Sequence, residues 1–239
     1  MLIKYIQLDE MFDVALLKKE VELLNASHWK AHYNKNNYEG DWSTIQLRSI
    51  NGSVDNNTAI QPGALQNGSV FKDTMLMELC PYIKQLTGQF KMEKTAVRLM
   101  KLNAGAVIKP HKDDALHFEE GEVRIHIPVT TSPEVYFFLE EERIVMEEGT
   151  CWYLNLSLEH SVRNNGKSDR VHLVIDGVVN DWLRELFNQP HKKKASLADD
   201  ALTPGYSPED KWKIIAQLRS MGTETGHKLA DDMEASLSL

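Results

Sequence analysis

The stretch VRIHIPV at residues 123–129 decides the fold, because its polar and aliphatic residues alternate. In a β-strand, successive side chains point to opposite faces of the sheet. Arg124 and His126 therefore share one face, and the opposite face is aliphatic. The stretch RVHLVID at residues 170–176 repeats this pattern. Its polar face carries Arg170, His172 and Asp176. Two strands of this kind indicate a sheet with one aliphatic face and one face of arginine and histidine.

The arginine and histidine faces of these strands have two explanations. They could be exposed to solvent, or they could line the mouth of a barrel that holds an anionic ligand. Exposed strand faces more often carry threonine, lysine, glutamate and serine. The guanidinium group of arginine, in contrast, offers a planar fork that fits a carboxylate through two hydrogen bonds. The pattern is therefore compatible with a buried anion site, and solvent exposure stays open.

The region that begins at Lys94 contains many short β-rich runs separated by turn residues. These runs are 95–102, 122–130, 135–139, 143–147, 151–155, 160–163 and 170–179. Short strands at this spacing predict a β-sandwich or barrel. Upstream, strands are expected at residues 2–7 and 43–48, and Asp9 is expected to cap a helix that runs to about Leu24. The sequence therefore predicts a mainly β protein with helices at its flanks.

The C-terminal part of the chain has a different composition. Residues 189–205 contain a run of lysines and a Pro-Gly pair, which predict a linker. A helix is expected from residue 208 to about 220, because it would start with a proline and two acidic residues. We therefore expect a folded domain at residues 1–185, with its β-core at about 94–180, and a linker with a helical appendage at residues 186–239.

The composition argues against several classes of protein. The net charge of −8 argues against a nucleic-acid-binding surface, which would need a basic patch. No membrane span is expected, because no stretch approaches 18 consecutive apolar residues. The first residues lack the long apolar segment of a signal peptide. Cys80 and Cys151 are too few for a disulfide framework and are expected to be buried thiols. These features predict a cytoplasmic protein.

The triplet His111-Lys112-Asp113, followed far downstream by His160, points to metal chemistry. Two histidines and one carboxylate are the ligands of a facial triad, which holds iron(II) on one side and leaves the other side open for oxygen chemistry. Residues i and i+2 of a strand share a face, so His111 and Asp113 can bind one metal ion together. An H-x-D triplet also occurs often by chance, so the triplet by itself is a weak indication.

Four stretches of the chain occur in the order and at the spacing of one known family. They are IKPHKDD (108–114), VRIHIPV (123–129), EEGTCWYLNLSLEHSVRN (147–164) and DRVHLVIDG (169–177). Through them the segment from Arg98 to Gly177 resembles the aspartyl/asparaginyl/proline hydroxylase family, and within it the bacterial free-proline cis-hydroxylases. The resemblance implies a double-stranded β-helix, that is, a cupin-like jelly-roll barrel with flanking N- and C-terminal helices. This fold agrees with the strand pattern.

The resemblance also implies an activity that depends on iron(II), 2-oxoglutarate and oxygen. The implied iron ligands are His111, Asp113 and His160. It implies that Arg170 pairs with the far carboxylate of 2-oxoglutarate and that Arg124 and His126 help to orient this cosubstrate. The reaction would hydroxylate an unactivated C–H bond of a free amino acid or similar small substrate and release succinate and carbon dioxide. Asp113 favours this amino-acid branch, because the aspartyl/asparaginyl branch lacks the carboxylate ligand.

The substrate and the partners are the least defined part of the prediction. Arg48, on the expected strand at 43–48, could bind a substrate carboxylate or could be a surface arginine. Trp42 and the loop at residues 50–69 could form a lid. The alternatives are a hydroxylase of an Asp, Asn or Pro residue in a peptide or carrier-tethered substrate, a cupin-type metal enzyme without 2-oxoglutarate, and a non-catalytic jelly-roll binding module. The apolar stripe of the C-terminal helix could pack on the barrel or form a homodimer.

Overall fold

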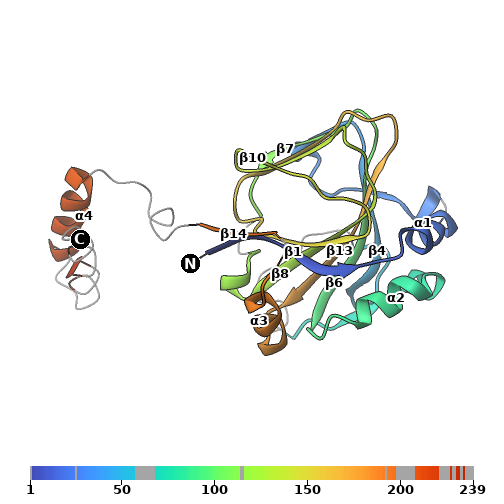
Figure 1. The fold of residues 1–239 in the computed structure, drawn as a ribbon, viewed down its shortest axis with the longest axis horizontal. Helices are drawn as coiled ribbons and strands as arrows, with labels where there is room; N and C mark the ends of the chain where they lie inside the picture. The colour runs from blue at the N-terminus through green and yellow to red at the C-terminus, as the bar shows by residue number, and fades with distance from the viewer. Residues whose placement is uncertain are drawn as a thin grey trace. The chain divides into compact units, whose positions relative to one another are not determined.

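The computed structural model contains two compact units, Ile3–Ala195 and Met1–Leu2 with Ser196–Leu239. The residues that it describes are 2–24, 26–56, 68–113, 116–191, 193–197 and 208–220, together with 227, 230, 231 and 234. The second unit contains helix α4 (Pro208–Ser220), which confirms the helix predicted there (Figure 1). On this helix Trp212 is 50% exposed.

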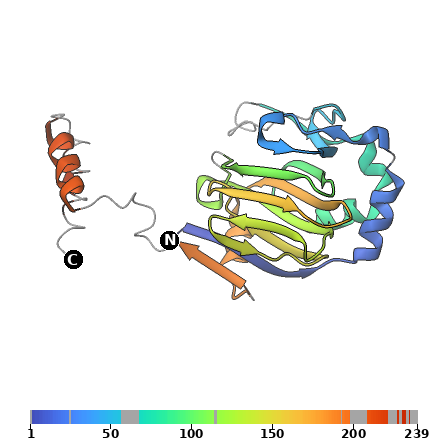
Figure 2. The same cartoon turned by 90° about the horizontal axis from the view of Figure 1, so that it is seen from above.

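Two antiparallel sheets form the larger unit (Figures 1 and 2). The larger sheet comprises β1 (Leu2–Met11), β2 (Lys30–Ala31), β4 (Trp42–Ile50), β5 (Phe71–Asp73), β6 (Lys94–Leu102), β8 (Glu122–Thr130), β11 (Thr150–Leu154), β13 (Arg170–Val178) and β14 (Lys193–Leu197). Its order is β14-β1-β11-β8-β13-β6-β4-β2, with β5 beside β4. The smaller sheet comprises β3 (Tyr38–Glu39), β7 (Val107–His111), β9 (Val135–Leu139), β10 (Glu142–Ile144) and β12 (His160–Asn164). Its order is β10-β9-β12-β7-β3. The predicted fold class, a mainly β jelly roll with flanking helices, is confirmed.

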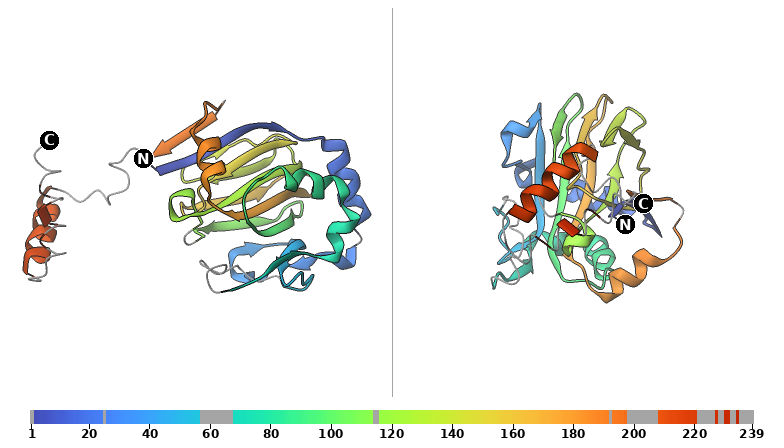
Figure 3. Two further views of the ribbon diagram at one scale, coloured as in Figure 1. Left: turned by 90° about the horizontal axis from the view of Figure 1, so that it is seen from below. Right: turned by 90° about the vertical axis from the view of Figure 1, so that its left-hand side faces the viewer.

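The helices of the larger unit lie on the outer face of the larger sheet (Figure 3). They are α1 (Val14–Leu23), α2 (Pro81–Gly88) and α3 (Asp181–Asn188), with short 3₁₀ turns at Ala26–His28, Lys35–Asn37, Met75–Leu79 and Phe118–Glu120. Buried Glu20 joins α1 to α2, because its carboxylate accepts the backbone N–H groups of Tyr82 and Ile83 at 2.6 and 2.9 Å. An anion at a helix N-terminus satisfies donors that have no partner inside the helix. No helix in the described residues is both long and apolar enough to cross a membrane.

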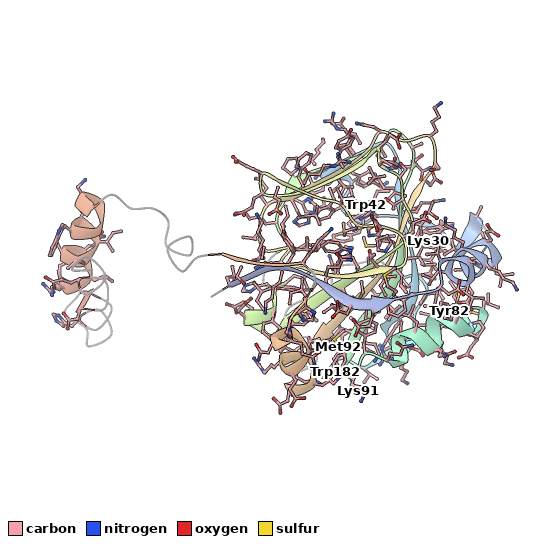
Figure 4. All side chains as sticks on the ribbon, viewed as in Figure 1. Lys30, Trp42, Tyr82, Lys91, Met92 and Trp182 are labelled. Carbon is pink, nitrogen blue, oxygen red and sulfur yellow. The ribbon has the colours of Figure 1, made fainter. Side chains whose placement is uncertain are left out.

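Strand alternation divides the buried apolar residues into two cores. Ile125 of β8 and Leu173 of β13 are fully buried in the core between the larger sheet and the helices. Full burial of such a side chain stabilises the fold by roughly 1.5–3 kcal/mol. The second core lies between the two sheets and contains Trp42 and Val174. Figure 4 shows Trp42 in this inner region and Trp182 on the side of α3. The arginine and histidine faces of β8 and β13 therefore point inward.

Several predicted boundaries differ from the structure. The first strand continues to Met11, because it pairs with β11 as far as that residue. Asp13, not Asp9, therefore caps α1, and its carboxylate accepts the N–H of Leu16 at 3.1 Å. Strand β14 lies inside residues 189–205, which were predicted to be a linker. Both cysteines are free and buried, as predicted.

Gly149 is a position where the backbone tolerates no side chain. Its φ is +76°, and a Cβ atom would lie 2.6 Å from the carbonyl oxygen of Phe12. Its own carbonyl accepts the N–H of Phe12 at 2.9 Å, which holds the start of α1 against the barrel. Gly105 has a similar φ of +80° but open space around its Cα. A side chain at Gly105 would therefore cause backbone strain alone, whereas a side chain at Gly149 would cause both strain and a steric clash.

We expect Gly105→Ala to lower the free energy of unfolding by about 1–2 kcal/mol, the cost of a left-handed backbone. Gly149→Ala should cost about 1–3 kcal/mol more, because it adds the clash with Phe12 to the same backbone strain. Urea denaturation of both variants measures this difference. Equal losses in the two variants would contradict the proposed clash.

Candidate functional site

The pairing of β7 with β12 brings the predicted metal ligands together. His160 lies directly opposite His111 in this pair, and their ring centroids are 4.3 Å apart. Asp113 follows the end of β7, where its backbone N–H donates to the carbonyl of Leu156 at 2.8 Å. One ligand atom from each of His111, Asp113 and His160 lies within 4.8 Å of the other two. The structure therefore places all three residues in one cluster.

Backbone carbonyls fix the orientation of both imidazole rings. Nδ1 of His111 lies 2.7 Å from the carbonyl oxygen of Lys109, and Nδ1 of His160 lies 3.0 Å from that of Leu158. A carbonyl can only accept, so Nδ1 carries the proton and Nε2 is the free lone pair. Burial lowers the pKa of His160 to about 4, so this ring is neutral at neutral pH. Neutral imidazoles of this tautomer are suited to bind a metal ion.

The cluster forms one wall of a narrow, open pocket between the two sheets, with a cavity volume of about 40 Å³. Its apolar lining consists of Trp42, Met100, Ile108, Phe137, Leu156 and Val162. The remaining lining residues are Arg124, His126 and Arg170. The pocket therefore brings the metal-ligand candidates together with two arginines and a histidine.

Arg170 is a buried cation that has no carboxylate partner among the described residues. It is 4% exposed, its Nη2 donates to Nδ1 of His172 at 3.0 Å, and its Nε has no hydrogen-bond partner. Burial lowers the pKa of Arg170 to about 9, which leaves the group charged at neutral pH. A buried charge without a counter-ion costs several kcal/mol in general. Arg170 is therefore poised to receive an anion in the pocket.

Arg124 lines the same pocket, but its guanidinium group is hydrogen-bonded to carboxylates of the protein. Its Nη1 donates to Oδ2 of Asp113 at 2.7 Å. Its Nε and Nη2 donate to the two oxygens of Asp176 at 2.6 and 3.0 Å. Asp176 also accepts a hydrogen bond from Arg98. Arg124 therefore lines the pocket and contacts a metal-ligand candidate, and its expected role in orienting the cosubstrate stays a prediction.

His126 lies in the pocket with both ring nitrogens buried and without partners. Its ring centroid is 5.7 Å from that of His172. Burial, reinforced by the charge of Arg170, lowers the pKa of His126 well below its ordinary value. His126 is therefore neutral and retains a free donor and a free acceptor.

Arg48 does not reach this pocket. Its Nε, Nη1 and Nη2 donate to the carbonyl of Lys94, the carboxylate of Asp73 and the carbonyl of Phe71 at 2.8, 2.9 and 2.9 Å. A β-bulge between Gln46 and Arg48 shifts the register of β4 against β6, so Arg48 does not continue the inward face. The structure therefore places Arg48 where it joins β4 to β5 and β6.

Sequence patterns did not indicate His32, whose ring packs against that of Trp42 in the pocket wall. The two rings are stacked, with centroids 3.5 Å apart and planes at 13°. Burial, aided by Arg98 and Arg124, lowers the pKa of His32 to about 3. Its surroundings at residues 26–41 form short irregular elements without a period. Trp42 itself lies in β4, and residues 57–67 of the loop that was considered as a lid lie outside the described residues.

The chain matches one known protein family over most of its length. The family model described as aspartyl/asparaginyl beta-hydroxylase matches residues 12–179, which is more than half of the chain. The chain belongs to this family. The matched region includes both histidines of the cluster, its aspartate and Arg170.

Among curated proteins, the chain is 26% identical over 168 residues to L-proline cis-4-hydroxylase of Rhizobium meliloti (strain 1021). The match covers 69% of this chain and 57% of that protein, so the chain spans less than two thirds of the relative's length. Among solved structures, a Pseudomonas putida prolyl-4-hydroxylase is 13% identical with a TM-score of 0.43, covering 74% of this chain and 94% of that one. HygX from Streptomyces hygroscopicus, with nickel and 2-oxoglutarate bound, is 9% identical with a TM-score of 0.45, covering 75% and 84%.

We expect His126→Leu to reduce the loss of stability that accompanies acidification. An unfolded histidine binds a proton near pH 6.5, whereas folded His126 does not, so folding becomes less favourable as the pH falls below 6.5. The variant should lose about 1 kcal/mol less than the wild type between pH 6.5 and 5.5. Urea denaturation across this range measures the difference. An identical pH dependence in both proteins would show that His126 titrates normally in the folded state.

Proposed function

We propose that this protein is an iron(II)- and 2-oxoglutarate-dependent dioxygenase that hydroxylates a C–H bond of a free amino acid or similarly small substrate. One observation carries this proposal. Arg170, a buried cation without a carboxylate partner among the described residues, lies in the same pocket as His111, Asp113 and His160. Membership of the aspartyl/asparaginyl β-hydroxylase family supports the reaction class.

The donor set of the cluster fits iron(II). Two imidazole nitrogens and one carboxylate oxygen are the ligands of the facial triad of non-haem iron oxygenases. Nδ1 of each histidine is held by a backbone carbonyl, so Nε2 is the nitrogen left for the metal. Oδ2 of Asp113 is bonded to Arg124, while Oδ1 lies 3.9 Å from Nε2 of His111. We infer that His111, Asp113 and His160 hold the metal.

The unpartnered polar atoms of the pocket fit 2-oxoglutarate. This cosubstrate is a dianion, and Arg170 offers a desolvated positive charge with a free Nε. A carboxylate that joins a buried guanidinium forms short, charge-assisted hydrogen bonds, which offset the burial cost. His126 retains a free donor on the same face. We infer that Arg170 binds the far carboxylate and that His126 helps to orient the cosubstrate.

With iron(II) and 2-oxoglutarate bound, oxygen is activated, and the cosubstrate is converted to succinate and carbon dioxide as a hydroxyl group enters the substrate. The chain itself supplies position and exclusion of water. Trp42, Phe137 and Leu156 form apolar parts of the wall and would limit the access of water.

The proposed substrate class rests on this pocket and on one relative. The pocket places an unpartnered buried guanidinium close to the three metal-ligand candidates. The curated relative is an L-proline hydroxylase, but the chain spans only 57% of its length. We therefore propose a free amino acid as the substrate class, without assigning the amino acid or the carbon.

Arg170→Ala should weaken 2-oxoglutarate binding and leave metal binding nearly unchanged. Anaerobic iron(II) with 2-oxoglutarate should produce a weak visible charge-transfer band in the wild type, and titration of this band gives the cosubstrate affinity. Loss of a charge-assisted hydrogen bond of about 1.5–3 kcal/mol corresponds to a roughly 10- to 100-fold loss of affinity. The matched control is Arg163→Ala, which removes an exposed arginine from β12.

The outcomes separate the metal assignment from the cosubstrate assignment. No band in the wild type would contradict the proposed function. A band in Arg170→Ala with unchanged affinity would contradict only the role of Arg170. A loss in Arg163→Ala as large as that in Arg170→Ala would indicate a general charge effect.

Succinate release should increase with one or a few free amino acids. The experiment measures succinate formed from 2-oxoglutarate in the presence of each common amino acid and of short peptides that contain Asp, Asn or Pro. Product masses 16 Da above the substrate, from one added oxygen atom, identify the hydroxylated compound. Release that depends on peptides alone would favour the peptide hydroxylase. A charge-transfer band without turnover on either class would contradict the proposed substrate.

A further inference from the structure

Asp176 stands between two buried arginines of the larger sheet. It lies directly opposite Arg124 in the pairing of β13 with β8. Its two carboxylate oxygens accept the Nε and Nη2 hydrogens of Arg124 at 2.6 and 3.0 Å, and Arg98 of β6 donates to it as well. The side chain of Asp176 is 7% exposed. Asp176 therefore fixes the plane of the Arg124 guanidinium group from behind.

The remaining nitrogen of Arg124 reaches the metal cluster. Once Nε and Nη2 are bonded to Asp176, Nη1 points to Oδ2 of Asp113 at 2.7 Å. The other oxygen of Asp113, Oδ1, lies 3.9 Å from Nε2 of His111. The two oxygens of Asp113 therefore have different surroundings. Oδ2 accepts a hydrogen bond from Arg124, and Oδ1 faces the histidines. Asp176 acts on Asp113 only through this arginine, because it is not among the residues that line the pocket.

The charges of these four residues balance one another. Arg98 and Arg124 face Asp113 and Asp176, so the group is neutral as a whole. Burial opposes the ionisation of Asp176, but Arg124 and Arg98 outweigh it and lower the pKa of Asp176 to about 2. A buried ion network can serve stability alone, so the geometry at Asp113 is what distinguishes a second role.

We propose that Asp176 is a positioning residue, which holds Arg124 so that Asp113 presents Oδ1 to the metal. This inference rests on the proposed metal site. Residues that hold a metal ligand commonly change metal affinity 10- to 100-fold when they are replaced. Asp176 would therefore determine how tightly the site holds its metal, although it contacts neither metal nor substrate.

The test is a titration of the metal-free protein with cobalt(II), followed through the visible absorption of the bound ion. Asp176→Asn keeps the shape of the side chain, but its amide has one acceptor oxygen, so Nε and Nη2 of Arg124 can no longer each bond to a separate oxygen. We expect cobalt(II) affinity to fall about 10- to 100-fold. The matched control, Glu185→Gln, removes one negative charge from an exposed position of α3 and should leave the affinity unchanged.

A double variant separates positioning from charge and from stability. Asp176→Asn leaves two buried arginines with one carboxylate, which could repel the metal or prevent folding. The double variant of Arg98→Gln and Asp176→Asn restores the neutral charge balance. It still lacks the carboxylate that accepts from Nε and Nη2 of Arg124. The proposal is supported if the double variant has wild-type thermal stability but binds cobalt(II) more weakly. If the single variant does not fold, the double variant alone tests the proposal. Cobalt(II) affinity that returns together with stability would overturn it.

One further variant distinguishes this inference from the proposed metal site. His111→Ala should abolish cobalt(II) binding at this site if the cluster is the metal site. Binding in the wild type that persists in His111→Ala would contradict the proposed function itself. Binding that depends on His111 but is equal in the wild type and Asp176→Asn would overturn only the role of Asp176.

Discussion

The antiparallel pairing of β7 with β12 is the constraint on which the candidate site depends. It places His160 directly opposite His111, although the two residues are distant in sequence. Side chains alternate along a strand, so a shift of the pairing by one residue would turn His160 to the other face of the sheet. The irregularity between His160 and Val162 lies beside this point, where β12 also pairs with β9. Strands β9 and β3 flank this pair and help to hold β12 and β7 in register.

The electrostatics of the pocket divide the arginines into two kinds. Arg98 and Arg124 have carboxylate partners in Asp176 and Asp113, although Nε of Arg98 has no hydrogen-bond partner, and the carboxylates raise the pKa of Arg124. Among the described residues Arg170 contacts the neutral ring of His172 and no carboxylate. The low dielectric constant of the interior strengthens the attraction within a charged pair. It also makes a buried charge without a partner costly. A ligand that places an anion beside Arg170 therefore gains binding free energy from this ion pair.

Residue alternation was enough to predict β8 and β13 and to place their polar side chains on one face. It left open whether that face points inward or toward solvent, which the second sheet decides. The cluster of His111, Asp113 and His160 was predicted through the family resemblance, because the H-x-D triplet and a distant histidine are by themselves a weak indication. Arg48 could not be placed, since the bulge that moves it off the inward face leaves no mark on the alternation. The contacts of Arg124 could not be predicted either, because they depend on the register between β8 and β13. His32 belongs to an irregular segment, which has no period from which its position could be read.

The charge balance of the assembled site bears on its substrate. On the proposed assignment, iron(II) and dianionic 2-oxoglutarate cancel in formal charge, and Arg98 and Arg124 cancel Asp113 and Asp176. Arg170 then leaves one positive charge that no other group in the pocket lining offsets. A low-dielectric pocket with one remaining positive charge favours a substrate that carries a carboxylate and disfavours a purely cationic one. Every free amino acid brings an α-carboxylate, together with an ammonium group, whereas a residue inside a peptide brings a carboxylate only from an acidic side chain, so this charge balance favours the proposed substrate class over a neutral peptide residue.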